Sequence, residues 1–102
     1  MLPNNTHQPD LPISILIVNN DPQALATIDA SLQVLAQVTT ICVDSAQKAL
    51  RVLRQQTIDL LIVDVDLPDL DGWRLSRLVR SGILLCRIDL PIIITAHTWC
   101  ER

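Results

Sequence analysis

Short apolar runs alternate along the chain with segments in which apolar residues recur every three or four positions. The runs are rich in Ile, Leu and Val, a composition that favours strands buried on both faces of a sheet. The segments between them have the spacing of amphipathic helices. The pattern predicts four strands, over residues 12–18, 38–43, 58–64 and 91–95.

The predicted helices begin at residues that commonly cap helices. Asp21 precedes Pro22, which is favoured at the first helical position, and Asp44 or Ser45 precedes the second helix. Asp71-Gly72 opens the third helix. The residues expected to face the core are Leu25, Ile28, Leu32 and Leu35, then Ala46, Ala49, Leu50 and Leu53, and finally Leu75, Leu78 and Val79.

Strands that alternate with helices of this length predict an α/β fold, a doubly wound parallel sheet with helices on both faces. In the strand order 2-1-3-4, the first and third strands are neighbours and the fourth lies beside the third. Right-handed crossovers would then bring Asn19, Asn20, Asp64 and Thr95 to one edge of the sheet. We expect one domain over residues 12–102, preceded by a flexible polar leader at residues 1–11.

Composition and charge narrow the class of protein. The chain has 102 residues, is 49% hydrophobic and contains no Phe or Tyr, so its core should be aliphatic, with Cys42 as a small core residue. A formal net charge of -3 argues against a nucleic-acid surface. Three cysteines without CxxC spacing favour reduced thiols and a cytoplasmic location. No apolar run reaches membrane-spanning length, and no signal peptide is evident, so we expect no membrane partner.

The stretch from Leu60 to Gly72 is the main candidate for a functional site. Four apolar residues are followed at once by Asp64, which places a carboxylate at the carboxyl end of a buried strand. Ligands bind at this edge in open α/β sheets, and a partly buried carboxylate is costly without a role. We therefore take Asp64 as the chemical centre. Asp66, Asp69 and Asp71 are more typical of turn and cap residues.

Three blocks, each at the end of a predicted strand, resemble the receiver domain of bacterial two-component response regulators. They are Ile15–Pro22, Asp64–Pro68 with Asp71-Gly72, and Pro91–Ala96. The resemblance covers nearly the whole chain, from residue 13 to residue 95. It implies a flavodoxin-like fold and a role in phosphorelay signalling, as a signalling module and not an enzyme.

The resemblance also implies roles for single residues. Asp64 would accept a phosphoryl group from a phosphohistidine on a histidine kinase or phosphotransferase protein, with Mg²⁺ offsetting the charge repulsion. The implied metal ligands are Asn20, Asp64 and the backbone carbonyl of Asp66, with a weak contribution from Asn19 or Asp21. The family has acidic residues where Asn19 and Asn20 stand, so we expect weak Mg²⁺ binding. For Asp21 a helix cap is favoured over metal ligation.

Three further positions match the family pattern, and one part of that pattern has no match. Thr95 matches the switch hydroxyl that turns toward the phosphoryl group, and Pro68 and Gly72 match the turn after the phosphoacceptor. No counterpart of the family's fifth strand or its lysine is present, and the single lysine, Lys48, lies in the second helix. We therefore expect an apparent truncation. The strand at 91–95 would have an open edge that invites a homodimer.

Two other functions stay open at this point. The chain is either a working phosphoacceptor or a pseudo-receiver, an interaction module of the same fold that is not phosphorylated. Asp64-Val65-Asp66 is also similar to the first motif of haloacid-dehalogenase-type phosphatases, in which the first Asp is the nucleophile and the second a general acid/base. Against the phosphatase, two βα units precede the motif and Pro68 interrupts its loop.

Overall fold

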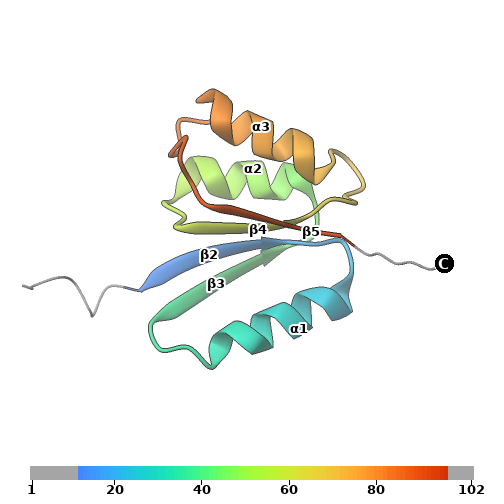
Figure 1. The fold of residues 1–102 in the computed structure, drawn as a ribbon, viewed down its shortest axis with the longest axis vertical. Coiled ribbons are helices and arrows are strands. Elements are labelled where there is room, and N and C mark those ends of the chain that lie inside the picture. Colours follow the sequence, from blue (N-terminus) through green and yellow to red (C-terminus); the bar gives the residue numbers. More distant parts are fainter. Residues whose placement is uncertain (1–11, 97–102) are drawn as a thin grey trace, which may run out of the picture.

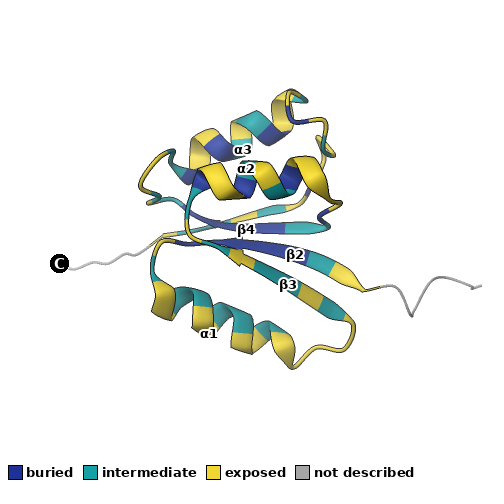
Figure 2. Cartoon of the chain, turned by 180° about the vertical axis from the view of Figure 1, so that it is seen from behind, coloured by how far each residue is buried: buried dark blue, intermediate teal, exposed yellow. Residues whose placement is uncertain are grey.

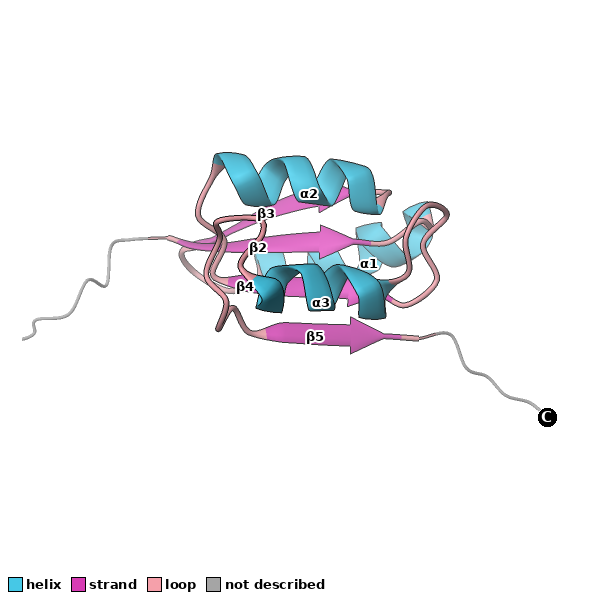
Figure 3. Cartoon of the chain, turned by 90° about the horizontal axis from the view of Figure 1, so that it is seen from above, coloured by secondary structure: helices cyan, strands magenta, loops and turns pink. Residues whose placement is uncertain are grey.

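A computed structural model describes residues 12–96 of the chain, so the predicted leader lies outside the described residues. Its four strands form one parallel sheet in the order β3-β2-β4-β5, which is the predicted order 2-1-3-4 (Figure 3). Each predicted strand and helix is present, and the strand boundaries differ from the prediction by at most two residues. In chain order the elements are β2 (Ile13–Val18), α1 (Pro22–Gln33), β3 (Val38–Val43), α2 (Ala46–Gln55), β4 (Leu60–Asp64), α3 (Gly72–Ser81) and β5 (Ile92–Thr95).

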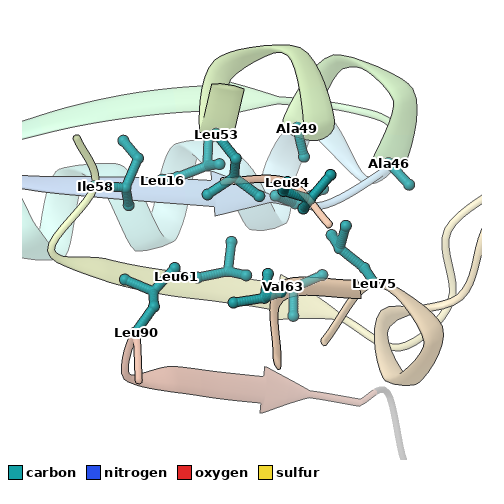
Figure 4. Close-up of a cluster of buried hydrophobic side chains, with 12 residues drawn as sticks. Leu16, Ala46, Ala49, Leu53, Ile58, Leu61, Val63, Leu75, Leu84 and Leu90 are labelled. Atoms are coloured by element: carbon teal, nitrogen blue, oxygen red, sulfur yellow. The ribbon is translucent and has the colours of Figure 1, made fainter. Parts of the chain in front are cut away.

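The helices form two layers, one on each face of the sheet. Helix α1 covers one face, and α2 and α3 lie side by side on the other (Figure 1). Most of the buried apolar side chains lie between the sheet and the α2–α3 layer, as Figure 2 shows by burial and Figure 4 in close-up. They come from the central strands β2 and β4, from both helices and from the loop before β5. This cluster includes Leu16, Leu53, Leu61, Val63, Leu75 and Leu90.

The core on the α1 side is smaller. Ile15, Ile17 and Ile62 are buried there, and α1 itself contributes no buried residue. The prediction that Leu35 belongs to the apolar face of this helix is wrong, because α1 ends at Gln33 and Leu35 is 53% exposed. The chain has already left the helix there to reach the left-handed turn at Gln37 and then β3.

The prediction that Cys42 fills the core is also wrong, since its side chain is exposed. Strand β3 is an edge strand, and of its residues only Val38 packs against the cluster under α1. Strand β5 is the other edge of the described sheet, with Ile93 49% exposed. Pairing of this edge with a second copy stays a prediction. No helix within residues 12–96 is both long and apolar enough to cross a membrane.

The helix starts follow the cap signals of the sequence. The Asp21 carboxylate accepts a hydrogen bond from the Gln23 amide, and the Asp71 carboxylate accepts one from the Arg74 amide. For α2, the sequence allowed either Asp44 or Ser45 as the N-cap, and in the structure it is Ser45. These bonds satisfy amide groups that a helix cannot pair internally. They also fix where each helix begins, directly beyond the carboxyl edge of the sheet.

Helix α2 has a second cap, which comes from a distant part of the chain. The two carboxylate oxygens of Asp69, in the loop between β4 and α3, accept hydrogen bonds from the Ala46 amide at 3.0 Å and the Gln47 amide at 2.8 Å. Desolvation raises the pKa of Asp69, but the hydrogen bonds from backbone amides lower it by more. The pKa of Asp69 therefore lies below the ordinary value. Asp69 thus ties the loop after β4 to the start of α2.

We expect Asp69→Ala to reduce the free energy of unfolding by about 1–2 kcal/mol at neutral pH, the usual cost of losing a helix cap. Because the pKa is depressed in the folded state, this contribution is present above the unfolded pKa and is lost as the pH falls through the folded pKa. Urea unfolding followed by circular dichroism should show the difference at pH 7 and a smaller one below about pH 4.

Asp66→Ala is the matched control, because it removes the same charge from the same loop. Its urea midpoint should stay near that of the unaltered protein. Equal midpoints for the Asp69→Ala and Asp66→Ala variants would show that the cap contributes nothing.

Candidate functional site

Asp64 is the last residue of β4, and its side chain is 2% exposed. Its neighbour in the parallel pairing of β4 and β5 is Thr95. The Thr95 hydroxyl donates a hydrogen bond to one Asp64 carboxylate oxygen at 3.2 Å, and the Asp66 amide donates to the other at 3.2 Å. The structure therefore brings together the two residues that the sequence assigned to phosphate acceptance and switching. Their contact joins strands β4 and β5 through two residues that are 31 positions apart in sequence.

The asparagines after β2 lie at the same edge, because β2 is paired with β4. Asn19 is buried, with 4% exposure, and its side-chain oxygen accepts a hydrogen bond from the Asp21 amide at 2.9 Å. Asn20 is exposed. Asp21 caps α1, as the sequence favoured. Asn19 thus stabilises the turn between β2 and α1, while Asn20 is exposed to solvent at the carboxyl edge of the sheet.

The loop after Asp64 folds back against the end of its own strand. The Gly72 amide donates a hydrogen bond to the Val65 carbonyl at 3.1 Å. A Cβ atom at Gly72 would lie 2.6 Å from the Asp64 carbonyl oxygen and 3.1 Å from the Val65 Cα, so only glycine fits. Gly72 is therefore more than the turn residue that the sequence indicated. It permits the close approach of the helix start to the backbone that carries Asp64.

The rest of the predicted set lies on the same loop or well away from it. Asp66 and Pro68 are exposed in the loop between β4 and α3. Lys48 lies on α2 and forms an ion pair with Asp44 at 2.9 Å. For Asp69 the sequence predicted only a turn or cap residue. Its cap on α2 spans more than 20 positions, and no local pattern indicates which helix such a residue reaches.

Oxygen atoms suited to Mg²⁺ are present at this edge, but few of them carry charge. Asp64 offers a carboxylate and Asp66 a backbone carbonyl, while Asn19 and Asn20 offer neutral amide oxygens. Within residues 12–96, no group of three or more His, Cys, Asp or Glu side chains is placed to hold a metal ion. Mg²⁺ prefers charged oxygen ligands. The donor atoms therefore fit Mg²⁺ in kind, and their charge predicts a weak site.

A parallel sheet in the order 2-1-3-4, with a buried aspartate and a hydroxyl facing each other at its carboxyl edge, defines the class of receiver-like α/β domains. Residues 15–101 match the response regulator receiver domain family. The chain belongs to that family, and it is a receiver domain of two-component signalling. This assignment confirms the resemblance on which the sequence interpretation was built.

Individual relatives agree with the assignment. The chain is 31% identical over 93 residues to the signal transduction histidine-protein kinase BarA of Escherichia coli, covering 90% of this chain and 10% of that protein. It is 38% identical over 87 residues to the two-component response regulator ARR12 of Arabidopsis thaliana, covering 82% of this chain and 14% of that protein. A sensor protein from Polaromonas sp. JS666 has a similar structure, with a TM-score of 0.75 and 28% sequence identity. The match covers 84% of this chain and 66% of that chain. The chain thus spans only a small part of these two sequence relatives.

We expect Gly72→Ala to destabilise the fold by about 1–3 kcal/mol, because the new methyl group meets backbone atoms that cannot swing aside. Thermal unfolding followed by circular dichroism measures this loss. Gln47→Ala is the matched control, since Gln47 is an exposed residue in the first turn of α2. A Gly72→Ala variant as stable as the Gln47→Ala variant would contradict the close approach of α3 to the Asp64 backbone.

Proposed function

We propose that this domain receives a phosphoryl group on Asp64. The observation that carries the proposal is the burial of the Asp64 carboxylate at the end of β4, facing the Thr95 hydroxyl. A carboxylate oxygen would attack the phosphorus of a phosphohistidine. The new bond joins this oxygen to phosphorus, the P–N bond breaks, and the imidazole nitrogen keeps the electron pair. The product is an acyl phosphate on Asp64.

The two hydrogen bonds to Asp64 support this role. They hold the two carboxylate oxygens from different sides, one from the next strand and one from the following loop. Holding a nucleophile in one orientation lowers the cost of reaching the in-line geometry. After transfer, the Thr95 hydroxyl is within reach to donate to a phosphoryl oxygen, which would pull the end of β5 toward the site. We infer that Thr95 reports phosphorylation in this way.

Receiver domains bind Mg²⁺, and we infer that this one does so weakly. The residues that would hold the ion are Asp64, Asn20 and the Asp66 backbone carbonyl, with Asn19 or Asp21 contributing weakly. When bound, the metal offsets the repulsion between the carboxylate and the incoming phosphoryl oxygens. We assign Pro68 and Gly72 to the turn that returns the chain from Asp64 to α3.

Receiver domains act with histidine kinases, and we propose a histidine kinase or phosphotransferase protein as the phosphoryl donor here. One matched relative, BarA, is named as a signal transduction histidine-protein kinase. The proposed alternative is a pseudo-receiver, which keeps the fold and binds partners without phosphorylation. Asn19 and Asn20 favour this alternative, since they replace two charges that the family places beside the acceptor. The phosphatase hypothesis has no such support, because the match to the receiver family covers the Asp64-Val65-Asp66 motif on which that hypothesis was based.

Incubation with acetyl phosphate and Mg²⁺ should add one phosphoryl group to the protein, seen as an increase in intact mass. The adduct should be absent in Asp64→Asn, because an amide cannot act as the nucleophile. Asp66→Asn is the matched control, since it removes a carboxylate two positions away and should keep the adduct. A folded protein without an adduct, or an adduct that survives in Asp64→Asn, would contradict the proposal, and the first result would favour the pseudo-receiver.

We also expect Asn20→Asp to tighten Mg²⁺ binding by at least about tenfold, because it adds a negative charge beside a divalent ion. Isothermal titration calorimetry with MgCl₂ gives the affinity directly. Gln23→Glu is the control, since it adds the same charge at an exposed position in the first turn of α1. Equal affinities for Asn20→Asp and Gln23→Glu would exclude residue 20 from the metal site.

A further inference from the structure

The basic residues of this acidic chain are gathered on one side of the fold. Of the Lys and Arg residues within 12–96, all but Arg87 lie on α2 and α3, and neither helix contains an acidic residue. All of them are exposed, and the two helices lie next to each other on one face of the sheet (Figure 1). We call this surface the basic face; its residues are Lys48, Arg51, Arg54, Arg74, Arg77 and Arg80.

Half of these charges are not used within the fold. Lys48 and Arg74 form surface ion pairs with Asp44 and Asp71, and Arg80 donates to the carbonyl groups of the loop before β5. The guanidinium groups of the other three make no ion pair or hydrogen bond with any residue that the structure describes. These three residues are Arg51, Arg54 and Arg77. The face therefore presents three guanidinium groups, on two helices, that only solvent balances.

Two surface hollows lie beside these arginines. One, of about 340 Å³ on α2, is lined mainly by polar residues; they are Arg51, Arg54 and two glutamines, and Leu50 is its single apolar residue. Another, of about 620 Å³, is lined by Arg77 and Arg80 together with Trp73, Ile92 and Ile94. Trp73 is 61% exposed, so an apolar ring is available beside the charges. Both hollows thus adjoin arginines, and the one beside α3 also offers apolar surface, which fits a ligand that has carboxylates and apolar side chains together.

The length of the face argues against a long polyanion. Three cations spaced over two turns of a helix span about 9 Å along its axis. Beyond the amino ends of α2 and α3 stand the carboxylates of Asp44, Asp69 and Asp71, which would repel an anion extending that way. A short acidic segment can occupy the face without meeting them. A nucleic-acid duplex that follows the helix axes cannot.

We propose that the basic face docks an acidic polypeptide segment of a partner protein, in which apolar residues stand between the carboxylates. The arginines bind the carboxylates, and the hollow beside α3 takes the apolar side chains. The surface is separate from the edge that carries Asp64, and docking does not depend on phosphorylation. It can therefore be tested without acetyl phosphate or Mg²⁺, so that its failure and the failure of the proposed phosphoacceptor are distinguishable.

The test uses fluorescence anisotropy of a labelled synthetic peptide of repeating Glu-Glu-Leu triplets. We expect binding that weakens as salt is raised, and a loss of at least about tenfold in affinity in the triple variant Arg51→Gln, Arg54→Gln and Arg77→Gln. The matched control adds equal negative charge on the opposite layer. It carries Gln23→Glu, Ala26→Glu and Ala30→Glu, all exposed positions of α1, and should bind nearly as tightly as the unaltered protein.

Circular dichroism first establishes that each variant is folded, and the single variants Arg51→Gln and Arg77→Gln replace the triple variant if it unfolds. Unchanged affinity in the arginine variants would overturn the proposal. Equal binding of a peptide of Glu alone would overturn the role of the hollow beside α3. Equal or tighter binding of duplex DNA or of anionic lipid vesicles would assign the face to a different class of partner and also overturn the proposal.

Discussion

The parallel pairing of β4 with β2 and β5 is the constraint on which the rest of the structure depends. It aligns Asp64 with Thr95, and it brings the turn after β2 to the same edge of the sheet. A shift of β4 by one residue would move its side chains to the opposite faces of the sheet and turn Leu61 and Val63 away from the larger core. The burial of Leu61 and Val63 that stabilises the strand therefore also determines that Asp64 is its last residue and is itself buried.

Two contacts then hold the loop that follows. Gly72 lets the start of α3 approach the backbone of Asp64, and Asp69 joins the loop to the start of α2. Both contacts act on the segment that carries the Asp66 carbonyl. The loop is thus fixed at two points, against the end of β4 and against the start of α2.

The sequence predicted the strands, their order and the position of Asp64, because burial leaves continuous apolar runs and parallel sheets gather strand ends at one edge. It could not show that Cys42 is exposed, since exposure on an edge strand depends on how far α1 extends over it. Nor could it show the steric need for glycine at position 72 or the cap from Asp69. Both depend on contacts between segments that only the folded chain brings together.

The carboxylates near the sheet edge that carries Asp64 have different roles. Asp21, Asp69 and Asp71 each accept hydrogen bonds from the first amides of a helix, where a negative charge also favours the helix dipole. Asp64 differs from them, because it ends a buried strand and faces Thr95. At the other ends of α2 and α3, Arg54 and Arg80 complement the dipoles with positive charge. The separation of charge across the domain therefore begins as a helix-stabilising pattern. The arginines in the middle of the helices, Arg51 and Arg77, cap neither end, and they add positive charge to the exposed faces of α2 and α3.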